Sequence, residues 1–232
     1  FVLTAALSTS GSVTTWFREQ FARELPLDGA SDAGAAYERL SQEAEGSTLG
    51  ARGLLMLPYF SGERSPFNDA SARGVIAGLS LSHGRGDVYR AILEGTAFGI
   101  RHNLEAMVDS GTEPRRTVAV GGGVASRLWL QIVSDVTGLV QEIPDRSIGA
   151  AYGDAYLAAS TAGLLDARTG HSRAWVRILD RVEPDPDRRE RYQPLYELYR
   201  SLYTSTKKVV HALAAEARVP SETSASHAEA KP

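Results

Sequence analysis

The chain of 232 residues has 25 basic and 28 acidic residues, a formal net charge of −3, and 43% hydrophobic residues. This composition is ordinary for a soluble globular protein, and with no basic tract nothing points to nucleic acid as a partner. The chain contains no cysteine, which excludes disulfides, thiolate metal sites and cysteine nucleophiles.

The sequence also argues against a metal centre and a membrane anchor. The five histidines are scattered without the spacing of a zinc site. No apolar run approaches the ~18 residues of a membrane span, and no signal peptide is visible. We therefore expect no metal ligands in this chain, no membrane partner and a cytoplasmic location.

The first predicted elements are a strand over 1–8, a turn over 8–12 that contains Gly11, and two helices over 13–21 and 33–44. Asp32 suits the N-cap of the second helix, because its carboxylate can accept a hydrogen bond from a free amide. Since the strand-like run begins without a methionine, we expect the chain to begin inside a larger protein.

A buried strand over 53–57 is next, ended by Pro58, and an extended segment over 73–81 follows after a loop. That loop, 58–67, contains two prolines and the adjacent charges Glu63 and Arg64. A charge pair in such a loop more often fixes the shape of the loop or docks it against another domain than it performs catalysis. We expect the structural role.

A long helix is predicted over 87–109, with Asp87 as its cap and with Gly95 and Gly99 allowing another backbone to approach closely. The helix over 149–162 is crowded with alanine and glycine, so it should pack at short range. Residues 163–187 are predicted to be a connection. The last helix, 188–217, has tyrosines at 192, 196, 199 and 203, a stripe that favours core packing over ligand binding.

The most informative passage is a β-branched run over 117–120 that stops at three glycines, 121–123, directly before an amphipathic helix. That helix is expected to end near Thr137 with Gly138 as its C-cap, followed by a strand over 139–143. Glycine lets a ligand approach the backbone, and a helix N-terminus attracts phosphate. The turn is therefore either a nucleotide-phosphate cradle or only a tight connection.

Strands that alternate with helices predict an α/β fold, here as one domain over 1–218 with a polar, disordered tail over 219–232. The P-loop pattern GxxxxGK[ST], the Rossmann pattern GxGxxG and the hydrolase pattern GxSxG are all absent. A nucleotide that binds here must therefore bind by another scheme.

Four segments resemble the C-terminal part of the FGGY family of carbohydrate kinases, and their order holds from about Phe1 to Tyr203. They are the signature-like run 74–79 with 87–94, the PYxSGERxP-like loop 57–66, the GGGxxSxxW-like segment 121–132 and the GAAxGAA-like start 149–155, in which Asp154 departs from the pattern. Within the family the loop is most similar to xylulokinases and next to gluconate kinases.

The resemblance implies an RNase H-like domain of the actin/hexokinase/Hsp70-type ATPase fold, with its first strands missing. Two such domains face each other in the family, with sugar mainly on the first and ATP mainly on the second. Our chain resembles the second. By motif position, Gly11 lies near the nucleotide phosphates, Gly122 and Gly123 approach the α-phosphate and adenosine, and Ser126 borders the adenine pocket. Thr15 takes the place of a nucleotide-contacting glutamine of glycerol kinases.

No residue of this chain matches the family's catalytic aspartate, which belongs to the first domain. The four aspartates that invite such a role are expected to be loop, cap or surface residues: Asp69, Asp87, Asp135 and Asp154. The resemblance implies ATP and Mg²⁺ as cofactors, with Mg²⁺ held by phosphates, water and carboxylates of the other domain. The expected partners are a sugar, ATP and the chain's own N-terminal domain, and a homodimer is compatible with the sequence.

The sequence thus favours the ATP-binding half of a kinase for a pentulose such as D-xylulose, with gluconate or another sugar as alternatives, and inactive by itself. Two other interpretations stay open. One is a non-catalytic module of the same fold that binds nucleotide or a partner protein. The other is a structural α/β domain whose glycines only make turns.

Overall fold

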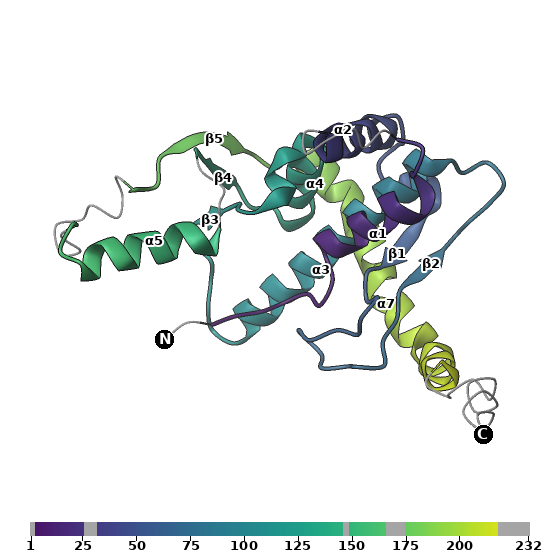
Figure 1. The fold of residues 1–232 in the computed structure, drawn as a ribbon. Coiled ribbons are helices and arrows are strands. Elements are labelled where there is room, and N and C mark those ends of the chain that lie inside the picture. Colours follow the sequence, from purple (N-terminus) through teal and green to yellow (C-terminus); the bar gives the residue numbers. More distant parts are fainter. Residues whose placement is uncertain (1–2, 26–31, 146–148, 166–174, 218–232) are drawn as a thin grey trace, which may run out of the picture.

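The computed structural model describes residues 3–25, 32–145, 149–165 and 175–217 and forms a mixed helix and sheet structure (Figure 1). The helices are α1 (Gly11–Phe21), α2 (Asp32–Glu45), α3 (Arg85–Asp109), α4 (Arg127–Thr137), α5 (Ala150–Thr161) and α7 (Pro186–Glu216). The strands are β1 (Leu55–Leu57), β2 (Val75–Ala77), β3 (Thr117–Val118), β4 (Gln141–Pro144) and β5 (Ile178–Val182). Two short 3-10 turns are η1 (Ala51–Gly53) and η2 (Gly122–Ala125).

The strands form two separate small sheets. β1 and β2 are antiparallel, with Met56 opposite Ile76. In the second sheet β4 is the middle strand, parallel to β3 and antiparallel to β5. The alternation of helices and strands confirms the α/β class. No helix among the described residues is long and apolar enough to cross a membrane.

Helix α3 is the axis of the molecule, and α1, α2, α4, α7 and β1 pack around it (Figure 1). Residues 89–99 of α3 are buried without interruption, although the run contains charged side chains. A helix that is covered on every side needs apolar or small residues all round, and this stretch has them apart from two charged residues, Arg90 and Glu94, that pair with each other. The core therefore surrounds α3 instead of lying on one face of a large sheet.

A buried ion pair on α3 connects three parts of the chain. Arg90 Nε donates to Glu94 Oε1 at 2.8 Å, and both side chains are nearly inaccessible to solvent. Arg90 also donates to the carbonyl oxygens of Ala44, in the last turn of α2, and of Ser47, just after it. Glu94 Oε1 accepts from the Gly50 amide at 3.1 Å and from the Tyr192 hydroxyl at 2.9 Å. The pair therefore fixes the end of α2 and the start of α7 relative to α3.

The predicted close approach of another backbone is confirmed at Gly95 but not at Gly99. A Cβ built on Gly95 would lie 2.4 Å from the Met56 carbonyl oxygen, so β1 crosses α3 at this point. A Cβ on Gly99 would lie 2.9 Å from Leu7 and 3.3 Å from the Tyr199 hydroxyl. Gly95 therefore lets a second backbone pack against α3, whereas Gly99 makes room for the ends of two side chains.

The tyrosine stripe of α7 is also confirmed as core. Tyr192, Tyr196 and Tyr199 are at most 4% exposed and surround Phe98 of α3 at ring-centroid distances of 5.4–5.9 Å. The fourth tyrosine, Tyr203, stacks on Phe67 at 4.1 Å. This stripe attaches α7 both to α3 and to the loop after β1.

Three predictions about local structure were wrong. The described part of segment 1–8 is not a strand, because its amides at Ala6 and Ser8 bond to side chains of the loop after β1 instead of to a strand. The predicted connection 163–187 contains β5, whose charged middle concealed its pairing with β4. Helix α5 has no buried residue, and Leu157 is 62% exposed, so it does not pack at short range within the described residues. The predicted disordered tail, 219–232, lies outside the described residues.

The substitution Gly95→Ala tests the crossing of α3 and β1. The added methyl group meets a backbone carbonyl that cannot rotate away, so we expect the free energy of unfolding to fall by about 2–3 kcal/mol. The control is Gly153→Ala in α5, where a Cβ meets nothing within 4 Å and the stability should rise by about 0.5–1 kcal/mol. Urea unfolding of both variants checks this, and equal effects would contradict the close crossing.

Candidate functional site

The first part of the candidate site is the start of α1. Gly11 is exposed, and a Cβ built on it would meet nothing within 4 Å. The N-cap residue, Ser10, makes no side-chain hydrogen bond to the helix. The first amides of α1 are therefore reachable from outside, as an anion-binding helix start requires.

The second part is the glycine turn between β3 and α4. Gly121 has a φ of +91°, which strongly favours glycine. The helix does not begin at once, contrary to prediction, because residues Gly122–Ala125 form the 3-10 turn η2. Helix α4 starts after it, with Ser126 as N-cap accepting from the Trp129 amide at 3.3 Å. Gly138 ends the helix with a φ of +74°, which confirms the predicted C-cap.

The predicted site glycines of this turn differ in what surrounds them. Gly122 is exposed, and its Cβ would point into open space. A Cβ on Gly123 would lie 2.9 Å from the indole ring of Trp129. Gly122 therefore leaves an open approach to the backbone, whereas Gly123 makes room for a side chain of the following helix, α4.

Both turns contact the same helix, α2. The Tyr37 hydroxyl lies 3.0 Å from Thr15 Oγ1 of α1, and Ser41 Oγ lies 3.2 Å from Ser126 Oγ. All four side chains are half-buried. The structure thus connects Ser126 and the first turn of α1 through α2, a link that no sequence motif indicated.

The loop after β1 holds the segment that leads into α1. Glu63 is 2% exposed, and its Oε1 accepts from the amides of Ser8 at 2.9 Å and of Arg64 at 2.8 Å. Burial raises the pKa of the Glu63 carboxyl, and the hydrogen bonds from these amides oppose that rise. Arg64 is exposed and forms no ion pair with Glu63 among the described residues. The expected structural role is confirmed for Glu63, which performs it through backbone amides and not through a charge pair with Arg64.

The other end of this loop is attached to α7. Asp69 and Glu63 exchange backbone hydrogen bonds of 2.9 Å, and Asp69 Oδ2 accepts from the Tyr203 hydroxyl and contacts His211 Nε2, both at 2.7 Å. Burial alone would raise the pKa of Asp69, but hydrogen bonds from Tyr203, His211 and Ser71 lower it to about 2. Asp69 is therefore a structural anchor of the loop.

The other three aspartates have no active-site arrangement either. Asp87 accepts from the Gly84 amide and the Ser47 hydroxyl, which confirms a capping role, but as the third residue of α3, because the helix begins at Arg85 with Gly84 as its N-cap. Asp135 is buried, not at the surface, and accepts from the Asp185 amide at 2.8 Å. Asp154 is exposed on α5. Each has the structural environment of a cap, a core bond or a surface residue.

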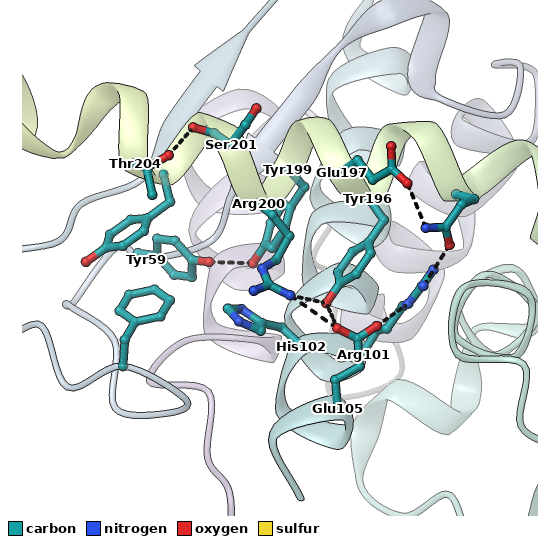
Figure 2. A pocket seen from close by; sticks show the side chains of 13 residues that line it. Tyr59, Arg101, His102, Glu105, Tyr196, Glu197, Tyr199, Arg200, Ser201 and Thr204 are labelled. Atoms are coloured by element: carbon teal, nitrogen blue, oxygen red, sulfur yellow. Dashed lines mark hydrogen bonds and ion pairs between the residues drawn. The ribbon is translucent and has the colours of Figure 1, made fainter. Parts of the chain in front are cut away.

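A hollow of about 750 Å³ lies between α3 and α7, away from the glycine turns (Figure 2). Glu105 accepts there from Arg101 at 2.9 Å, from the Tyr196 hydroxyl at 2.6 Å and from Arg200 at 3.2 Å. The charges that line the hollow thus satisfy one another. None of the predicted site residues lines it, and the network joins α3 to α7.

The profile of the FGGY family of carbohydrate kinases, C-terminal domain, matches residues 1–162. The chain belongs to this family. This FGGY domain is 31% identical over 204 residues to a xylulose kinase of Bacillus subtilis (strain 168), covering 88% of the chain and 39% of that protein. It is 33% identical over 201 residues to a ribulokinase of Mycolicibacterium smegmatis, covering 86% and 36%.

A solved structure agrees with the fold of the FGGY domain. The crystal structure of xylulose kinase from Rhodospirillum rubrum superposes with a TM-score of 0.75 at 34% identity, covering 89% of this chain and 40% of that one. The similarity confirms the predicted actin/hexokinase-type α/β fold. The chain spans well under half the length of each of these relatives.

The hollow beside α3 generates a pH prediction for His102. Burial, together with the nearby charge of Arg200, lowers the pKa of this imidazole from 6.5 to about 4, against the opposing charge of Glu105. The unfolded chain binds the proton more readily, so His102 should reduce stability progressively as the pH falls from about 6.5 to 4. NMR titration of the ring should give a midpoint near 4. A midpoint near 6.5 would contradict the packing of α3 against α7.

Proposed function

We propose that this chain is the nucleotide-binding half of a carbohydrate kinase, with the nucleotide at the two glycine turns. The open approach at Gly11 and Gly122 carries the proposal, since a Cβ at either position would face free space instead of protein. Membership of the carbohydrate kinase family supports the assignment of these turns to nucleotide binding. Ser126 would border the adenine pocket, and Gly123 would complete the turn. We take residues 1–218 as this one domain.

The reaction would transfer the γ-phosphoryl group of MgATP to a sugar hydroxyl. The bond between the γ-phosphorus and the bridging oxygen of ADP breaks, a bond from the sugar oxygen forms, and the hydroxyl proton passes to a base. Mg²⁺ would neutralise charge on the phosphates, held by these phosphates, water and carboxylates of the N-terminal domain. This chain's part is to bind and orient the phosphates through backbone amides at the starts of α1 and α4.

D-xylulose is the favoured sugar, in a cytoplasmic enzyme. The support is that several relatives are named xylulose kinases, among them proteins of Bacillus subtilis and Escherichia coli. A ribulokinase of Mycolicibacterium smegmatis has a similar identity, so similarity to this chain does not by itself select one pentulose. We place the sugar contacts and the catalytic base in the N-terminal domain, and a homodimer stays compatible with the proposal.

Binding of ADP tests the site through Gly122. We expect Gly122→Leu to weaken ADP at least tenfold by calorimetry, because the side chain occupies the approach to the backbone. Its thermal stability should stay close to wild type, since nothing lies within 4 Å of that Cβ. The matched control is Gly153→Leu in α5, which like Gly122 has no positive φ and no neighbour within 4 Å but lies outside the turns. Undiminished ADP affinity in Gly122→Leu would overturn the proposed site.

Turnover of the 232-residue chain tests whether catalysis needs the N-terminal domain in addition to this nucleotide-binding half. We expect no sugar phosphorylation above background in a coupled assay with D-xylulose and MgATP, because none of its four candidate aspartates is arranged as a base. Phosphoryl transfer depends on orienting the sugar hydroxyl, the base and the phosphates together, and this chain would orient only the phosphates. The same assay on the natural protein that contains this sequence should show turnover. Normal turnover by the chain alone would contradict the proposal, and an inactive natural protein that binds ADP would favour the non-catalytic alternative.

A further inference from the structure

A chain of hydroxyl contacts begins at the first glycine turn and reaches α2. Thr15 Oγ1 lies 3.3 Å from the Gly11 carbonyl oxygen, to which it donates. The same hydroxyl lies 3.0 Å from the Tyr37 hydroxyl. The guanidinium of Arg18 lies 5.3 Å above the Tyr37 ring. Tyr37 is thus attached to the first and second turns of α1.

A second chain of contacts leads from α2 to the other glycine turn. Ser41 Oγ lies 3.2 Å from Ser126 Oγ, and Ser126 accepts from the Trp129 amide at 3.3 Å. Ser41 follows Tyr37 by four residues, so both side chains lie on one face of α2. One face of a single helix therefore contacts the starts of both α1 and α4.

Helix α2 is itself firmly fixed. Leu40 and Ala44 are completely buried, and Arg90 of α3 donates to the Ala44 carbonyl oxygen. Arg85 of α3 forms a two-nitrogen contact with Glu43, at 2.8 and 2.6 Å. Because α3 is the axis of the core, the position of α2 is set by packing and does not follow either turn.

We propose that Tyr37 and Ser41, together the α2 bridge, are positioning residues that hold the two glycine turns at the spacing a nucleoside diphosphate needs. The inference rests on the proposed function. A ligand that contacts both turns binds more tightly when their spacing is already fixed, because the turns then lose no conformational entropy on binding. A ligand that touches only the adenosine end gains nothing from it.

Comparing the affinities for ADP and adenosine distinguishes a positioning role of Tyr37 and Ser41 from other roles. If Tyr37 and Ser41 contacted the base directly, their loss would weaken adenosine and ADP alike. If they only stabilised the fold, their loss would lower the unfolding temperature without changing the ratio of the two affinities. The α2 bridge predicts loss of ADP affinity with adenosine affinity preserved.

The experiment uses Tyr37→Phe, Ser41→Ala and the double variant in the natural protein that contains this sequence, each removing a hydroxyl without adding bulk. We expect each single variant to weaken ADP about five- to tenfold, the effect of one hydrogen bond, and adenosine less than about twofold. The double variant should weaken ADP by about the same factor as a single one, since releasing either end frees the spacing.

Two variants on α7 are matched controls. Tyr196→Phe removes a hydroxyl bonded to Glu105, and Ser201→Ala removes one bonded to the Leu198 carbonyl oxygen. Both should leave the ratio of ADP to adenosine affinity unchanged. Equal weakening of ADP and adenosine, unchanged ADP affinity, or additive effects in the double variant would each overturn the α2 bridge. Wild-type protein that does not bind ADP would overturn the proposed function, and this inference with it.

Discussion

The buried ion pair between Arg90 and Glu94 is the interaction on which the arrangement of the chain depends. Two charges taken out of water are costly unless their remaining donors and acceptors are satisfied. Here the satisfying groups are two carbonyl oxygens at the C-terminal end of α2, the Gly50 amide and the Tyr192 hydroxyl. The cost of burial is therefore offset only when α2, α3 and α7 are all in place, which couples the positions of the three helices.

The candidate site depends on this coupling because its two halves come from distant parts of the sequence. α2 is held by α3 at its C-terminal end and contacts both glycine turns through Tyr37 and Ser41. The loop after β1 fixes the approach to α1 through Glu63, and Asp69 connects that loop to α7. The turns themselves carry few side chains, so neighbouring elements must supply the rigidity that a phosphate site needs.

The glycines of this chain show how one residue type serves two physical purposes. Gly95 lets the backbone of β1 cross α3, and Gly123 makes room for Trp129, so both exist for packing. Gly11 and Gly122 have nothing within 4 Å of a Cβ, so packing does not require them. Open space alone does not imply a ligand, since several other glycines share it, and the nucleotide phosphate at these two positions is our proposal from the family membership.

The sequence by itself determined the α/β class, the family and most helices, because those follow from local periodicity, caps and short motifs. It also indicated the core role of the tyrosine stripe and the close approach at Gly95. Tertiary structure alone decided that Glu63 binds the Ser8 amide, that segment 1–8 is not a strand, and that α2 connects the turns. These features join residues far apart in the chain, and no local pattern encodes a contact whose partner is set by the packing of three helices.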